Sequence, residues 1–182
     1  MPEFKLVFTG TTGTTGAGKT TAIAAVSDVA PMATEARNMD AGFAKATTTV
    51  GMDYGELVLA DGETLRLYGT PGQERFDFMW KIIGRGALGL IILIDNSRPA
   101  PLEDFSRYLA GFADLLRTAP CVVGIGRTEG HPLPGLDAFV RVAARHGVTC
   151  PVIAANATRK DDVLQVIDLL LWQLTAHAEV AC

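Results

Sequence analysis

The sequence predicts an α/β fold in which a mostly parallel sheet carries helices on both faces. Short apolar runs alternate with helical patterns along the chain, which is the arrangement expected of a parallel sheet covered on both sides. The run over residues 88–94 is continuously apolar, as a strand buried on both faces should be. The chain has 182 residues and no recognisable linker, so residues 1–182 are expected to form a single domain.

The first half of the chain is expected to hold three strands and one helix. Apolar runs predict strands over residues 3–9, 50–60 and 64–68. Asp61 and Gly62 between the last two runs are a hairpin signal, so one antiparallel strand is expected at an edge of the sheet. A helix over residues 19–29 is expected to open at a glycine-rich loop, whereas the polar residues 30–48 are expected to form a long irregular loop.

The second half of the chain continues the alternation. Its apolar runs predict strands over residues 88–94, 121–125 and 152–155. Helical patterns separate and follow these strands over residues 101–118, 133–146 and 161–178. The last helix carries Asp161 and Asp162 at its start, where negative charge interacts favourably with the helix dipole. The complete sheet is therefore expected to have about six strands.

Residues 10–20 (GTTGTTGAGKT) contain a phosphate-binding loop. The stretch from Gly13 to Thr20 matches the pattern G-x-x-x-x-G-K-[ST], whose backbone N–H groups hold nucleotide phosphates. Because it follows a predicted strand and opens a predicted helix, it predicts a three-layer P-loop NTPase fold. Lys19 is expected on the β- and γ-phosphates and the Thr20 hydroxyl on Mg²⁺. The nucleotide-binding residues expected in this segment are Gly13, Gly16, Ala17, Gly18, Lys19, Thr20 and Thr21.

A tandem repeat lies inside this loop, because Thr11-Thr12-Gly13 recurs as Thr14-Thr15-Gly16. Three extended residues reach about 10 Å, which is comparable to the size of a phosphate pocket. The extra residues either bulge above the strand and leave the pocket unchanged, or widen the loop and alter the hydrolysis step.

Residues 69–75 (GTPGQER), directly after the third predicted strand, resemble the second switch of the small Ras-like GTPases. The resemblance implies that the Gly72 N–H contacts the γ-phosphate. It also implies that Gln73 and Lys19 are catalytic, and that Gln73 orients the attacking water. The family has an Asp that supports Mg²⁺ where this chain has Gly69, so this segment supplies one carboxylate fewer. The apolar side chains that follow form either a partner surface or part of the core: Phe76, Phe78, Met79 and Trp80.

Residues 47–54 (TTTVGMDY) resemble the first switch of the Rab branch of the same family. In that branch a Thr side chain closes on Mg²⁺, and alignment through residues 50–53 assigns this metal-binding role to Thr49. The three consecutive threonines leave the alignment open by one residue.

The base-reading segment departs from the family pattern. Small GTPases carry Asn-Lys-x-Asp after the fifth strand, where this chain reads Gly126-Arg127-Thr128-Glu129. The resemblance implies that Arg127 stacks on the base and that Glu129 accepts hydrogen bonds from guanine. It also implies that the N–H of Ala157 contacts the guanine O6. The altered pattern leaves both GTP and ATP open as ligands.

The resemblance spans nearly the whole chain, and it is closest to the compact bacterial Ras-like GTPases that include the gliding-motility polarity GTPases. It implies a cytoplasmic molecular switch that binds GTP and GDP with Mg²⁺ and hydrolyses GTP slowly. It also implies a roadblock/LC7-type regulatory protein as a partner. The alternative is a nucleotide-binding interaction module with little or no turnover. A small nucleotide or metabolite kinase would need an arginine-rich lid, which the sequence lacks.

Composition limits the partners further. The net charge of −4 gives no electrostatic reason to expect nucleic-acid binding. The longest apolar stretch, residues 87–94, is far shorter than the roughly 20 residues of a membrane-spanning helix. The three cysteines lack the close spacing of a metal site, which predicts free thiols in a cytoplasmic protein.

Overall fold

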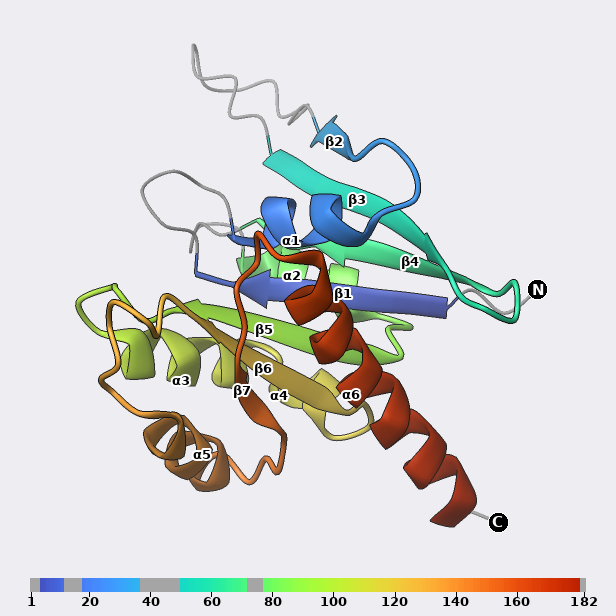
Figure 1. The fold of residues 1–182 in the computed structure, drawn as a ribbon. Helices are drawn as coiled ribbons and strands as arrows, with labels where there is room; N and C mark the ends of the chain where they lie inside the picture. The colour runs from blue at the N-terminus through green and yellow to red at the C-terminus, as the bar shows by residue number, and fades with distance from the viewer. Residues whose placement is uncertain (1–3, 12–17, 37–49, 72–76, 181–182) are drawn as a thin grey trace, which may run out of the picture.

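The computed structural model describes residues 4–11, 18–36, 50–71 and 77–180, and these residues form a seven-stranded sheet with helices on both faces (Figure 1). Across the sheet the strands are β2 (Met32–Ala36), β3 (Val50–Val58), β4 (Thr64–Gly69), β1 (Phe4–Gly10), β5 (Gly89–Asp95), β6 (Cys121–Gly126) and β7 (Val152–Ala154). Neighbours from β4 to β7 are parallel, while β3 runs against both β2 and β4. The predicted α/β fold of the P-loop NTPase type is confirmed.

Two hydrophobic cores lie on opposite faces of the sheet. The helices of one face are α1 (Gly18–Val26) and α6 (Lys160–Val180), and those of the other are α2 (Asp77–Gly84), α3 (Pro101–Gly111), α4 (Ala113–Leu116) and α5 (Leu136–Arg145). Alternate residues of β1 show the division, because successive side chains of a strand point to opposite faces. Leu6 and Phe8 are buried with α1 and α6, whereas Val7 is buried with Trp80 and Phe105.

A strand lies within the segment whose sequence predicts an irregular loop. Residues Met32–Ala36 pair antiparallel with β3, from Met32 opposite Tyr54 to Ala36 opposite Val50. The hairpin signal predicts β3 at the edge of the sheet. In the structure β2 occupies that edge, and β3 is the second strand from it. The sequence of β2 (MATEA) has no apolar alternation, so the strand depends on the backbone groups that the outer side of β3 offers.

The predicted helix over residues 101–118 is divided, and this expectation is corrected. At Phe112 the backbone has φ of −104° and ψ of 17°, which ends α3 before α4 begins. The Phe112 side chain is only 2% exposed, so the break occurs at a residue whose ring is buried in the core. The next helix, α5, begins at Leu136 instead of residue 133, because Pro134 disfavours helical backbone in the residue before it.

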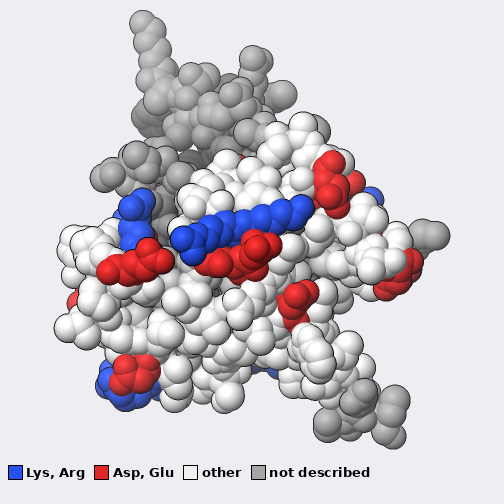
Figure 2. Space-filling view, viewed as in Figure 1, with Lys and Arg blue, Asp and Glu red and all other residues white. Residues whose placement is uncertain are grey.

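Charged side chains of both signs lie next to one another on the face seen in Figure 2, so this face has no continuous basic patch among the described residues. Within the described ranges, no helix combines the length and apolarity that crossing a membrane requires. Cys121 and Cys150 are free thiols, as predicted, and Cys182 lies outside the described residues.

Candidate nucleotide-binding site

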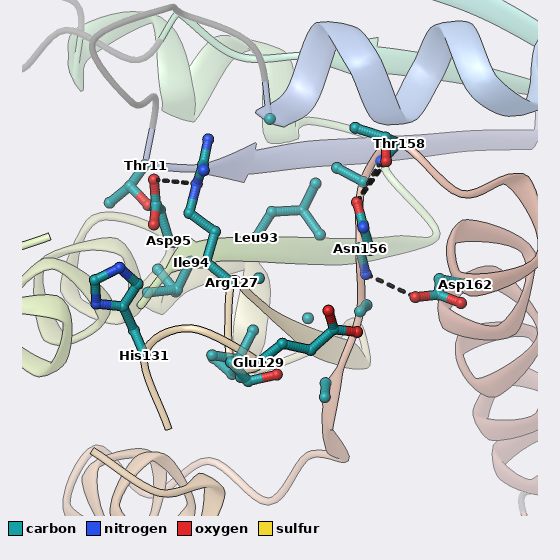
Figure 3. A pocket seen from close by; sticks show the side chains of 18 of the residues that line it. Thr11, Leu93, Ile94, Asp95, Arg127, Glu129, His131, Asn156, Thr158 and Asp162 are labelled. Carbon is teal, nitrogen blue, oxygen red and sulfur yellow. Dashed lines mark hydrogen bonds and ion pairs between the residues drawn. The ribbon is translucent and has the colours of Figure 1, made fainter. Parts of the chain in front are cut away.

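The loops after β1, β5, β6 and β7 leave the sheet at one edge, because these strands are parallel. Ligands of open α/β sheets bind at this carboxyl edge. A cavity of about 550 Å³ lies there, between the start of α1 and the loops after β6 and β7 (Figure 3). This volume is typical of small-molecule pockets. The fold therefore gathers the predicted phosphate-binding and base-reading segments around one cavity.

Lys19 lies inside the protein, in the first turn of α1, and is 2% exposed. Its Nζ donates a hydrogen bond to the Gly10 carbonyl oxygen at 2.8 Å. Gly10 has φ of +134°, and a Cβ there would lie 1.8 Å from the carbonyl oxygen of Leu93, so the turn after β1 requires glycine. This turn supplies the carbonyl oxygen that holds the ammonium group, and Gly18, the residue before Lys19, lines the cavity.

The electrostatics of Lys19 favour an anionic ligand. Burial lowers its pKa from 10.5 to about 8, and the carboxylate of Asp53 opposes this shift by favouring the charged form. The protein therefore compensates the buried ammonium charge only in part. Phosphate oxygens at the N-terminus of α1 would complete the compensation, and the first N–H groups of the helix would face the same anion.

Asp53 is a site residue that the sequence reasoning missed. The Thr20 hydroxyl donates a hydrogen bond to its Oδ2 at 2.6 Å. In the antiparallel ladder Asp53 lies opposite Gly69, the position at which Ras-like GTPases carry their metal-supporting Asp. A Cβ at Gly69 would lie 2.9 Å from the Asp53 Cβ and 3.1 Å from its Oδ2. Gly69 therefore leaves the space that Asp53 fills, and β3 supplies the carboxylate that β4 lacks.

A signal for Asp53 was present in the sequence. The Asp61-Gly62 hairpin pairs Val58 with Thr64, and following the same ladder back places Asp53 opposite Gly69. When a glycine lies opposite an Asp across an antiparallel ladder, the Asp carboxylate can fill the space that a side chain on the glycine's strand would otherwise occupy.

The pair formed by Thr20 and Asp53 fits Mg²⁺, because hydroxyl and carboxylate oxygens are the ligands this cation prefers. No cluster of three His, Cys, Asp or Glu side chains suited to a metal occurs within the ranges that the structure describes. Such a cluster is not required, since Mg²⁺ in nucleotide sites takes one or two carboxylates and completes its shell with phosphates and water.

Arg127 crosses the cavity edge toward β5. Its backbone has φ of +61°, and its Nε lies 3.2 Å from Oδ2 of Asp95 (Figure 3). The backbone N–H of Asp95 in turn donates a hydrogen bond to the Thr11 hydroxyl at 2.8 Å. The Arg127 side chain is 62% exposed, so this ion pair is worth about 1 kcal/mol or less. A pair this weak leaves the guanidinium available for other contacts, and its stacking on a base stays a prediction.

The loop after β7 is a hydrogen-bonded turn that lines the cavity. Asn156 Oδ1 accepts hydrogen bonds from the N–H of Thr158 at 2.9 Å and from its hydroxyl at 2.7 Å. The Asn156 N–H donates to Asp162 Oδ2 at 2.8 Å, which ties the turn to the start of α6 (Figure 3). Glu129 and Ala157 both line the cavity, so the structure brings together two residues from separate loops whose base-reading role stays a prediction.

The described members of the predicted site lie at the cavity or in the first turn of α1 beside it: Gly18, Lys19, Thr20, Thr21, Arg127, Glu129 and Ala157. The remaining members lie outside the described residues, and their roles stay predictions: Gly13, Gly16, Ala17, Thr49, Gly72 and Gln73.

The apolar side chains after the second switch divide between core and surface. Trp80 is 2% exposed, and Met79 is partly buried against the same core. Phe78 and Ile82, one turn apart on α2, are 64% and 59% exposed. Phe76 lies outside the described residues. The core interpretation therefore holds for Trp80, and α2 presents an apolar pair outward.

Fold and site together define a nucleotide-binding P-loop protein. The chain belongs to the family described as conserved hypothetical ATP binding protein, whose model matches residues 34–145. This match begins within β2 and ends with α5, and it includes the segments predicted to be the first switch and the base-reading loop.

Two curated proteins are similar to parts of the chain. One is the uncharacterized protein MJ1339 of Methanocaldococcus jannaschii, 36% identical over 56 residues, which cover 31% of this chain and 36% of that protein. The other is the Ras-related protein RABA2a of Arabidopsis thaliana, 30% identical over 73 residues, which cover 38% of this chain and 34% of that protein. The chain thus spans about a third of the length of these relatives.

Proposed function

We propose that the protein is a Ras-like molecular switch that binds GTP with Mg²⁺ and hydrolyses it slowly without an activating partner. The observation that carries this proposal is the contact between Thr20 and Asp53 next to the buried Lys19, in the first turn of α1. Gly18 and Thr21 of the same turn line the cavity. Glu129 and Ala157 line the same cavity. The first group suits Mg²⁺ with the β- and γ-phosphates, and the second suits a guanine base.

The residues of the phosphate end have separate tasks. Lys19 contacts the β- and γ-phosphates, and the N–H groups of the first turn of α1 face the same anion. Thr20 and Asp53 hold Mg²⁺, whose bound charge neutralises the phosphate oxygens. Residues assigned by resemblance respond to the γ-phosphate, whose loss releases the switch segments. These residues are Thr49, Gly72 and Gln73.

The choice between guanine and adenine depends on Glu129. A carboxylate only accepts hydrogen bonds, so it complements the N1–H and N2–H donors of guanine and cannot pair with the N1 acceptor of adenine. We expect Glu129→Gln to reduce the preference for GDP over ADP about tenfold, because the bonds lost are charge-assisted. Competition binding of the two diphosphates measures this preference. An unchanged preference would remove Glu129 from base reading.

The decisive experiment identifies the bound nucleotide and its fate. The purified protein is denatured, the released nucleotide is separated by chromatography, and phosphate release from GTP is then followed with and without a roadblock/LC7-type protein. Guanine nucleotide and measurable release support the switch. Adenine nucleotide refutes the guanine assignment, and bound GTP without release under either condition supports the interaction module instead. A Lys19→Ala variant that binds nucleotide as tightly as the parent protein would refute the assignment of the nucleotide site.

A regulatory partner of the roadblock/LC7 type is proposed to cover the outward-facing apolar pair Phe78 and Ile82. The pair lies on α2, which follows the second switch directly, so a partner bound there contacts the region that responds to the γ-phosphate. We expect Ile82→Ser to weaken binding of this partner, measured by calorimetry. Val140→Ser is the matched control, because Val140 is also exposed but lies on α5.

A further inference from the structure

The Gly10 carbonyl is held from both faces of the sheet. On one side it accepts the hydrogen bond from Lys19 Nζ at 2.8 Å, and on the other it accepts one from the Tyr108 hydroxyl at 2.7 Å. Tyr108 belongs to α3 and is 5% exposed. A carbonyl oxygen has two lone pairs, so both donors can be bound at once. The position of Lys19 therefore depends on an oxygen atom that Tyr108 also holds.

Tyr108 is in turn held by an aromatic stack. Its ring lies 4.9 Å from that of Trp80 with an interplanar angle of 27°, and Phe112 stacks on the indole at 5.3 Å and 9°. A Cβ on Gly111 would lie 2.6 Å from Cε3 of Trp80, so glycine at this position lets α3 approach the indole. These contacts leave the indole little room to shift without shifting Tyr108.

The indole also reaches the start of the second switch. Trp80 Nε1 donates a hydrogen bond to the Pro71 carbonyl oxygen at 3.3 Å within the buried interior. The chain before Pro71 is fastened to β1, because the Thr70 N–H donates to the Phe8 carbonyl at 2.9 Å and the Thr70 and Thr9 hydroxyls lie 2.7 Å apart. Pro71 is therefore the place at which the described chain leaves β1 for the second switch.

We propose that Trp80 and Tyr108 are positioning residues that couple the start of the second switch to the phosphate-binding lysine. The path consists of the Pro71 carbonyl, the Trp80 indole, the Tyr108 ring and hydroxyl, and the Gly10 carbonyl that holds Lys19. The inference rests on the proposed nucleotide site, since Lys19 must contact phosphate for the coupling to matter. Coupling between two sites is reciprocal. If the γ-phosphate shifts Pro71 and thereby weakens or strengthens the hydrogen bond that holds Lys19, the contact of Lys19 with phosphate affects Pro71 by the same free energy.

The expected signature is a loss of discrimination between triphosphate and diphosphate. Tyr108→Phe keeps the stacked ring and removes only the hydroxyl. Trp80→Phe keeps an aromatic ring, removes the N–H donor and reduces the ring area that stacks on Tyr108 and Phe112. Each variant is expected to lower the ratio of affinities for a non-hydrolysable GTP analogue and GDP about fivefold, the worth of one hydrogen bond. Because both act on one path, the double variant should lose no more than either single variant.

Tryptophan fluorescence gives a second readout. The chain has two tryptophans, and Trp172 is 75% exposed on α6, so Trp172→Phe leaves Trp80 as the reporter and serves as the control. In this background the emission of Trp80 is expected to change with the triphosphate analogue and not with GDP. If Trp80→Phe fails to fold, Tyr108→Phe and this fluorescence measurement still test the proposal.

The outcomes separate the coupling from the proposed function. Equal weakening of both nucleotides by Tyr108→Phe, additive losses in the double variant, or identical emission with both nucleotides would overturn the coupling. If the parent binds adenine nucleotides instead, the proposed GTPase function fails while the coupling is tested with ADP and an ATP analogue. A parent that binds neither purine nucleotide overturns both.

Discussion

Replacing Lys19 by methionine should stabilise the nucleotide-free protein while abolishing nucleotide binding. The lowering of the Lys19 pKa from 10.5 to about 8 means that the fold disfavours its charged form by roughly 3 kcal/mol near neutral pH. Methionine has a similar length and no charge. Its cost is the hydrogen bond to the Gly10 carbonyl, about 1 kcal/mol, and this oxygen keeps its bond from Tyr108. The net gain in the free energy of unfolding should be about 2 kcal/mol.

The gain has a defined pH dependence. Between about pH 8 and pH 10.5 the unfolded parent binds the Lys19 proton while the folded parent releases it, so the parent's stability rises with pH. The variant lacks this group. The stability difference between the two proteins should therefore shrink across this window, while all other titrating groups cancel in the comparison.

Urea unfolding of nucleotide-stripped protein at about pH 7 and about pH 10 measures both effects. Lys81→Met is the matched control, because Lys81 is exposed on α2 and its replacement should change stability by less than about 0.5 kcal/mol. A Lys19→Met variant that is less stable than the parent near neutral pH, or whose advantage does not change with pH, would refute the reasoning.

Two further predictions concern the glycines of the site. Gly69→Asp in the presence of Asp53 should cost about 1–3 kcal/mol of stability, because even a Cβ at this position lies 2.9 Å from that of Asp53. The exchange Asp53→Gly with Gly69→Asp removes the Asp53 Cβ and should then recover both stability and the Mg²⁺ dependence of nucleotide binding that Asp53→Gly alone loses. Calorimetry that finds no recovery would show that the two positions do not substitute for one another. Gly10→Ala should prevent stable folding or cost at least about 3 kcal/mol, since its Cβ would overlap the Leu93 carbonyl and its φ is +134°. Thermal unfolding measures this cost, and a variant of parental stability would contradict it.

Much of the fold was predictable because its signals are local. The continuous apolar run of β5 and the Asp61-Gly62 hairpin each depend on residues that are neighbours in the chain. The strand β2 and the break at Phe112 were not predictable in this way. One depends on pairing with the outer side of β3, and the other occurs at a ring that is buried by tertiary packing.

The candidate site divides along the same line. The pattern ending in Lys19 and Thr20 predicts the phosphate end, since the pattern and its strand–helix context are contiguous. Reading each segment by itself assigned no role to Asp53, because its role depends on the residue that faces it across the hairpin. Nor did it connect Asp95 with Arg127, which form an ion pair and both line the cavity.

The sequence by itself determined that this chain has a P-loop at the end of its first strand, an α/β order of elements, and segments like the two switches of Ras-like GTPases. These properties follow from steric and periodic rules that act over a few residues. Only the tertiary structure decided that the carboxylate beside Thr20 comes from β3 and that Tyr108, far along the chain, holds the oxygen on which Lys19 depends. Contacts of this kind arise when strands and helices pack, so no single segment of the sequence specifies them.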